Sequence, residues 1–226
     1  CRSTARRCAL RAGRLAGEAW EARVGGGATA ELAEAYRMQA MIRLFSGAVA
    51  DAEQPATQAL DLYHRLGNPQ GEAWATQHLA WIAFMLGRIE EGERRIEASV
   101  RMFEAVGDRT GMMWSLGLEA NLLFHNGFAE AAAEVAEVVL EEARLSDNAW
   151  AEGMMVSVLA QVDLWRGATD VALTGAERAV ELLGPLGDPF GLTQARMLLG
   201  RALVMAGRVQ AGLAELDRAT RENGDK

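Results

Sequence analysis

Glycine returns every forty residues along this chain of 226 residues, and that spacing constrains the fold more than any other feature. Each of these glycines follows an apolar stretch and precedes an amphipathic one; they are Gly47, Gly87, Gly127, Gly167 and Gly207. A second series keeps the same step and consists of Gly67, Gly107, Asp147 and Gly187. Glycine readily adopts the left-handed conformation in which many helices end. Two such stops in every forty residues predict two helices per unit, and therefore a run of helical hairpins.

The expected fold is all-α, with about five hairpins of forty residues in a single repeat domain spanning residues 1–226. The repeats are expected at 28–67, 68–107, 108–147, 148–187 and 188–226. Polar caps or prolines should start the first helix of a unit, at Asn68–Pro69, Asp108, Asp147–Asn148 and Asp188–Pro189. Residues 1–27 end in phase with the later turns, so we interpret them as a half repeat cut from a longer protein. An unusual N-terminal capping helix is the alternative.

Small residues recur where two helices must approach closely. Seven residues before each turn glycine stand Ala40, Ala80, Ala120, Ala160 and Gly200; five after it stand Ala52, Gly92, Ala132, Ala172 and Gly212. This pattern resembles the tetratricopeptide repeat (TPR) along essentially the whole chain. The resemblance implies an α-solenoid wound as a right-handed superhelix. The usual TPR period is about 34 residues, and forty falls in the range of HEAT and armadillo repeats. Those repeats would want proline and aspartate inside the hairpin, whereas Pro55 is the only proline well inside a repeat helix, so we favour the TPR-like fold.

The longer repeat, with turns such as LGDPFGLTQARMLLGRALVMAGR (186–208), is similar to the C-terminal arrays of large bacterial signal-transduction ATPases. That group includes the LuxR-type ATP-binding regulators and the maltose-regulon activator. In it the array senses an effector or holds a partner, while separate domains hydrolyse ATP and bind DNA. The resemblance implies a module of a larger bacterial regulator that acts in signal transduction and transcription regulation.

The charge and composition of the chain limit the kinds of partner that it is expected to bind. The formal net charge of −8 argues against direct nucleic-acid binding, which needs a concentrated basic face. No apolar run approaches the roughly 18–20 residues that span a bilayer, so no membrane contact is expected. The start of the chain is basic without an apolar segment behind it, unlike a signal peptide. Cys1 and Cys8 are expected to be free thiols, which favours a cytoplasmic location.

Catalytic motifs are missing from the sequence. Lys226 is the only lysine, so the P-loop pattern GxxxxGK[ST] has no place to occur. His64, His78 and His125 fall in different units without ligand spacing, and HExxH, CxxC and GxSxG are absent. We therefore predict no catalytic residue, no cofactor-binding residue and no metal ligand, and expect that the chain is not an enzyme.

Binding is expected on the first helix of each hairpin, because the resemblance implies that these helices line the concave groove of the array. At the places that line this groove in TPR arrays the chain carries aromatic, amide and arginine side chains. Aromatic residues offer rigid apolar area and amides can pair with a peptide main chain. The predicted ligand- or peptide-binding residues are Arg37, Trp74, Gln77, Trp81, Trp114, Asn121, His125, Gln161, Trp165 and Arg201. The alternative is that the tryptophans serve only to pack one repeat on the next.

The sequence thus favours a non-catalytic module that binds a protein or peptide. Two alternatives stay open. The chain could sense a small-molecule effector inside a regulatory ATPase, or it could associate with itself as a homo-oligomer through the end hairpins.

Overall fold

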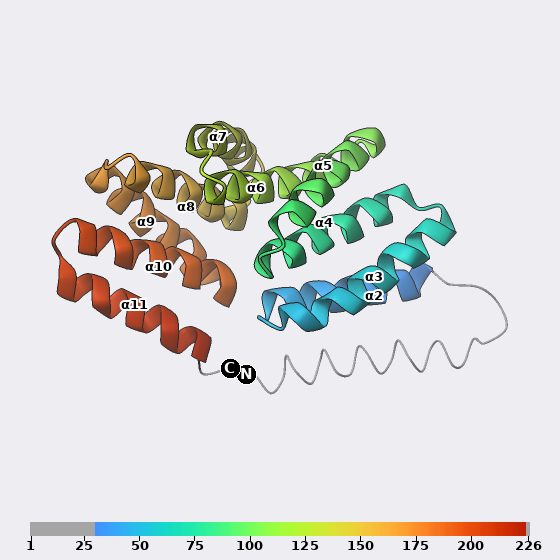
Figure 1. Cartoon of the computed structure of the whole chain (residues 1–226), viewed down its shortest axis with the longest axis horizontal. Helices are drawn as coiled ribbons and strands as arrows, with labels where there is room; N and C mark the ends of the chain where they lie inside the picture. The colour runs from blue at the N-terminus through green and yellow to red at the C-terminus, as the bar shows by residue number, and fades with distance from the viewer. Residues whose placement is uncertain (1–29, 225–226) are drawn as a thin grey trace. The chain divides into compact units, whose positions relative to one another are not determined.

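The computed structural model describes residues 30–224, which fold into α-helices joined by short turns and one 3-10 helix (Figure 1). The predicted half repeat 1–27, with Cys1 and Cys8, lies outside these residues. The elements are α2 (Ala30–Phe45), α3 (Val49–Leu66), α4 (Pro69–Met85), α5 (Ile89–Val106), α6 (Arg109–His125), α7 (Ala129–Leu145), α8 (Ala149–Trp165), α9 (Thr169–Leu183), η1 (Gly184–Leu186), α10 (Pro189–Met205) and α11 (Val209–Gly224).

Within each part of the chain, neighbouring helices pair as hairpins, and hairpins pack on their neighbours. Within hairpins, α2 packs on α3, α4 on α5, α8 on α9 and α10 on α11; between hairpins, α3 packs on α4, α7 on α8 and α9 on α10. The first helices of successive hairpins also touch directly, as α2 does α4 and α8 does α10. The expectation of an all-α, TPR-like array of helical hairpins is confirmed.

The chain divides into two compact units between Ser115 and Leu116. The first unit, in the described part of the chain, holds residues 30–115, and the second holds residues 116–224. None of the helices described in them combines the length and the apolar character that a membrane crossing requires.

Left-handed residues end the helices at the predicted positions. Glycines of both series have positive φ, and Asp147 takes the same conformation with φ of 51°. In the turn after α4, the Gly87 N–H donates to the Phe84 carbonyl at 3.0 Å, and the Arg88 N–H donates to the Ala83 carbonyl at 2.8 Å. This pair of hydrogen bonds satisfies carbonyl groups that the end of a helix would otherwise leave unpaired. The glycine ladder is therefore a ladder of helix stops.

Polar caps start the first helices, as the sequence predicts. Asn68 accepts a hydrogen bond from Gly71 N–H at 2.9 Å, Asp108 from Gly111 N–H at 2.9 Å, and Asn148 from Ala151 N–H at 3.1 Å. Asp188 caps α10 in the same way, accepting from Gly191 N–H at 2.9 Å. These caps satisfy backbone donors in the first turn of each helix.

Two of these caps also tie consecutive hairpins together. In the first unit, the Asp108 carboxylate accepts from Trp74 Nε1 at 3.1 Å and from Gln70 Nε2 at 2.9 Å. In the second unit, Asp188 accepts from Trp150 Nε1 at 2.7 Å. Each aspartate thus caps the first helix of its own hairpin and also accepts a hydrogen bond from the first helix of the hairpin before it.

Close approach of the helices explains the small residues. Ala40, Ala80, Ala120 and Ala160 are at most 1% exposed. At the last hairpin, a Cβ added to Gly212 would lie 2.6 Å from the Gly200 carbonyl oxygen, so the two backbones touch there. Side chains larger than these would hold the paired helices apart.

A second packing rule links the second hairpin to the first and the third hairpin to the second. A Cβ on Gly71 would lie 2.2 Å from Tyr63 Cδ1, and a Cβ on Gly111 would lie 2.2 Å from Phe103 Cε1. In both pairs a large ring eight residues upstream occupies the space of the missing side chain. At the next junction, between the third and fourth hairpins, both places carry small residues, Ala143 and Ala151. The glycine therefore leaves the space that the ring of the preceding helix fills.

We expect Gly111→Ala to destabilise the protein by about 1–3 kcal/mol, because the new methyl group overlaps the fully buried Phe103 ring. Gly117→Ala in the same helix is the matched control, since its Cβ would meet Met155 Cε at an ordinary 3.4 Å. That change should be neutral or stabilise by up to about 1 kcal/mol. Urea denaturation of both variants checks this; equal destabilisation by both would contradict the packing rule.

Candidate functional site

Five of the ten predicted binding residues lie together in the first unit. They stand on α2, α4 and the start of α6, the first helices of three successive hairpins, and are Arg37, Trp74, Gln77, Trp81 and Trp114. We call the side-chain surface of these helices within residues 30–115 the inner face of the first unit. The direct packing of α2 on α4 brings their side chains within reach of one another.

A polar layer crosses one end of this inner face. Arg37 Nε donates to Glu34 Oε2 at 2.9 Å, and the Tyr63 hydroxyl donates to the same carboxylate at 2.7 Å. The Arg37 guanidinium also lies over the Trp74 ring, with Cζ 5.8 Å from the ring centroid, in a cation–π contact. Because Trp74 in turn donates to Asp108, the layer runs from α2 across α4 to α6.

An aromatic layer crosses the inner face about two turns further along α4. The Phe45 ring centroid lies 6.4 Å from that of Trp81 and 6.3 Å from that of Trp114. Such tilted and edge-on ring pairs are favourable beyond the area they bury. Phe45 therefore joins side chains from three successive hairpins.

The carboxylates of the polar layer are held ionised. The hydrogen bond from Arg37 is the main cause that lowers the pKa of Glu34, against an opposing effect of partial burial. Burial works to raise the pKa of Asp108, but the hydrogen bonds from Gly111 N–H, Gln70 and Trp74 outweigh it and lower that pKa. Because Glu34 is ionised, its negative charge balances the positive charge of Arg37 within the layer.

Gln77 lies on α4 between the two layers, three residues after Trp74 and four before Trp81. Its side chain is 1% exposed, and neither Nε2 nor Oε1 has a hydrogen-bond partner. Burying an amide without partners costs about 1–3 kcal/mol, and native proteins contain few such groups. The buried amide of Gln77 thus lowers the stability of the inner face.

His78 is the neighbouring buried polar group. It is 4% exposed and packs against Trp74 with ring centroids 6.2 Å apart, and its Nδ1 has no hydrogen-bond partner. Burial, reinforced by the positive charge of Arg37, lowers the pKa of His78 to about 3. The imidazole is therefore neutral at neutral pH and is held away from solvent.

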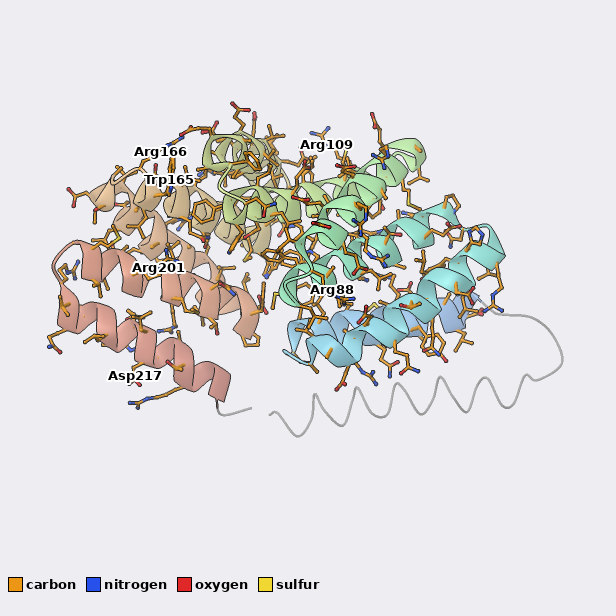
Figure 2. The ribbon with its side chains drawn as sticks, in the orientation of Figure 1. Arg88, Arg109, Trp165, Arg166, Arg201 and Asp217 are labelled. Atoms are coloured by element: carbon orange, nitrogen blue, oxygen red, sulfur yellow. The ribbon has the colours of Figure 1, made fainter. Side chains whose placement is uncertain are left out.

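The other five predicted residues lie in the second unit and use their side chains differently. Asn121 Nδ2 donates to the Gly117 carbonyl at 2.9 Å, and Gln161 Nε2 donates to the Ser157 carbonyl at 3.3 Å, so both amides bond to their own helices. His125 is exposed, with Nδ1 2.8 Å from the Asn121 carbonyl oxygen. Figure 2 places Trp165 beside Arg166 at the end of α8 and Arg201 on α10.

The predicted tryptophans differ in how much of their side chains is exposed to solvent. Trp165 is 65% exposed, whereas Trp81 is 3% exposed, and Trp74 and Trp114 are half-buried. Arg201 is exposed as well. The predicted set is therefore not one uniform surface, and its role in binding stays a prediction.

Several residues of the inner face were not in the predicted set. Phe45 and Glu34 occupy places that line the groove in TPR arrays, so the repeat phase could have found them. Tyr63 and His78 have no such signal. Tyr63 reaches Glu34 across 29 residues of sequence, and the burial of His78 depends on its neighbours in space.

Exposed apolar side chains gather on the last hairpin, in α10 and α11. They are Met197, Val204, Met205, Val209 and Leu213. The residues one and four repeats before Val204, Leu164 and Leu44, are buried. These side chains suit the predicted self-association, which stays a prediction. Among the described residues, no cluster of three or more His, Cys, Asp or Glu side chains is placed to hold a metal ion.

The fold and the inner face define the chain as an array of TPR-like helical hairpins. No protein-family model matches the chain. Its sequence is similar to that of the regulatory protein AfsR of Streptomyces griseus, with 26% identity over 175 residues. The match covers 77% of this chain and only 17% of AfsR, so the chain spans about a sixth of that regulator's length.

Two solved structures show the same fold. BtubC from P. vanneervenii is 23% identical with a TM-score of 0.61, and the match covers 99% of this chain and 89% of BtubC. A signal transduction ATPase with numerous domains (STAND) and a tetratricopeptide repeat sensor, from Pyrococcus horikoshii, is 15% identical with a TM-score of 0.62. That match covers 85% of this chain and 29% of the ATPase. The expected resemblance to TPR-like arrays of bacterial regulators is confirmed.

We expect the buried His78 to make stability depend on pH. Its pKa is lowered from 6.5 to about 3, so below pH 6.5 the unfolded chain binds a proton that the folded chain does not. Stability is therefore lost as pH falls, by about 1 kcal/mol between pH 6 and pH 5. Urea titrations of the wild type and of His78→Leu at both pH values check this; equal losses in both proteins would show that His78 is not the cause.

Proposed function

We propose that this chain is a non-catalytic module that binds an extended peptide segment of a partner protein across the inner face of the first unit. One observation carries the proposal: Phe45, Trp81 and Trp114, from three successive hairpins, meet in one ring cluster, and the buried Gln77 lies one helical turn before Trp81 on α4. Clustered aromatic side chains dominate the energy of many binding surfaces. An amide next to them suits the donors and acceptors of a peptide main chain.

The state of the polar groups supports a binding role over a catalytic one. His78, whose pKa is lowered to about 3 by burial, is neutral and buried, so a substrate has no direct access to it. Arg37 and Glu34 neutralise one another. We propose that the module binds and does not turn over its ligand.

The similarity to AfsR supports a place in a regulator. AfsR is a regulatory protein, and the solved STAND protein contains a tetratricopeptide repeat sensor. We propose that the parent protein is a bacterial cytoplasmic regulator of transcription or signal transduction, in which this module receives the signal while other domains act on it.

Selection from an equimolar library of synthetic peptides tests the proposal. Peptides of about six residues span about 20 Å when extended, enough to cross the first helices of neighbouring hairpins. We expect the wild-type chain to retain a subset of peptides, identified by mass spectrometry. Trp114→Ala should weaken those peptides at least about tenfold, as for an aromatic hot spot.

Trp165→Ala is the matched control, because it removes an exposed tryptophan of the second unit. It should leave peptide affinity unchanged. Retention of no peptide, or equal losses in both variants, would contradict the proposal. A metabolite that raises the melting temperature when no peptide is retained would instead support the small-molecule alternative.

A further inference from the structure

The unpaired amide of Gln77 calls for a physical explanation. Comparable residues in the second unit avoid the problem, because Asn121 and Gln161 donate to carbonyl groups one turn back in their own helices. Gln77 Nε2 makes no such bond, and its Oε1 is unpaired as well. A methionine of similar shape would fill the site at a lower cost in free energy. The amide is therefore not explained by the stability of the fold.

Gln77 lies between two tryptophans along the inner face. Residues three and four apart share one face of a helix, so Trp74 and Trp81 flank Gln77 on α4. Trp74 makes a cation–π contact with Arg37 of α2 and donates a hydrogen bond to Asp108 at the start of α6. Trp81 is covered by Phe45, which also meets Trp114.

The contact between Phe45 and Trp114 joins α2 to α6, the first and third hairpins, across the middle helix α4. Both side chains are half-buried and reach the surface. Their rotation breaks no helix hydrogen bond, and surface side chains change rotamer quickly. We call this pair of rings the aromatic gate.

The chemistry of the enclosed site points to a neutral amide as its ligand. The carboxamide of Gln77 offers both a donor and an acceptor, and a peptide main chain offers the complementary acceptor and donor. An anionic ligand would need a free positive charge, but Arg37, the cation that lies over Trp74, already pairs with Glu34. A main-chain amide satisfies both free atoms of Gln77 without adding charge.

We infer that the aromatic gate of Phe45 and Trp114 opens to admit an extended peptide, whose main-chain N–H and C=O pair with Oε1 and Nε2 of Gln77. This inference rests on the proposed function and names the anchoring group and the closing element of that site. The free protein holds Gln77 in an unfavourable, closed state, and the peptide relieves it.

Gln77→Met tests the inference with two readouts. In the free protein it replaces an unpaired amide with an apolar side chain of similar shape, so we expect the melting temperature to rise. It should also weaken the peptides selected by the wild type at least about tenfold. Gln161→Met is the matched control: it removes an amide that bonds to its own helix, and should leave those affinities unchanged.

Main-chain methylation identifies the paired group. Each N–H of a selected peptide is replaced in turn by N–CH₃, which removes one donor. One position should weaken wild-type binding about tenfold and have little further effect on Gln77→Met, because both changes remove the same hydrogen bond.

The outcomes separate this inference from the proposed function. Retention of no peptide by the wild type overturns both. Peptides that lose affinity with Trp114→Ala but bind Gln77→Met as well as the wild type uphold the binding surface and overturn the role of Gln77. A fall in melting temperature for free Gln77→Met also overturns it, because the amide would then be paired within the folded protein.

Discussion

The left-handed turn at the end of each helix is the constraint on which the rest of the structure depends. Such turns end the helices at evenly spaced positions along the chain, so the hairpins have a constant length and phase. Because the phase is constant, Ala40, Ala80, Ala120 and Ala160 arrive at the closely packed positions within their hairpins, and the caps Asn68, Asp108, Asn148 and Asp188 arrive where the next first helix begins. Asp147 shows how strong this constraint is, since it adopts φ of 51° where the other turns use glycine.

The same repetition explains why the helices could be predicted from the sequence and the state of the inner face could not. Turns, helix caps and the small residues at fixed places of each repeat are local features that recur, so each repeat supports the interpretation of the others. The burial of a side chain depends on what its neighbours in space place over it. The sequence predicts that Trp81 and Trp165 both line the groove, yet Trp81 packs against Phe45 and is buried, whereas Trp165 is exposed at the end of α8.

The inner face of the first unit combines two kinds of contact with opposite effects on stability. The polar layer is satisfied: Glu34, Arg37, Tyr63, Trp74 and Asp108 exchange hydrogen bonds or a cation–π contact across three hairpins. Gln77, next to it, is not satisfied. The protein thus retains an unfavourable buried amide one helical turn from its aromatic cluster, and functional sites are where such departures are expected.

The indole N–H signals of the tryptophans, followed by ¹H–¹⁵N NMR during titration with a selected peptide, test the central claim most directly. Each tryptophan reports on its own surroundings, and substitution assigns each signal. The account predicts that the signals of Trp81 and Trp114 shift on binding while those of Trp150 and Trp165 stay in place. Shifts confined to Trp165 or Trp150, with those of the first unit unchanged, would contradict it.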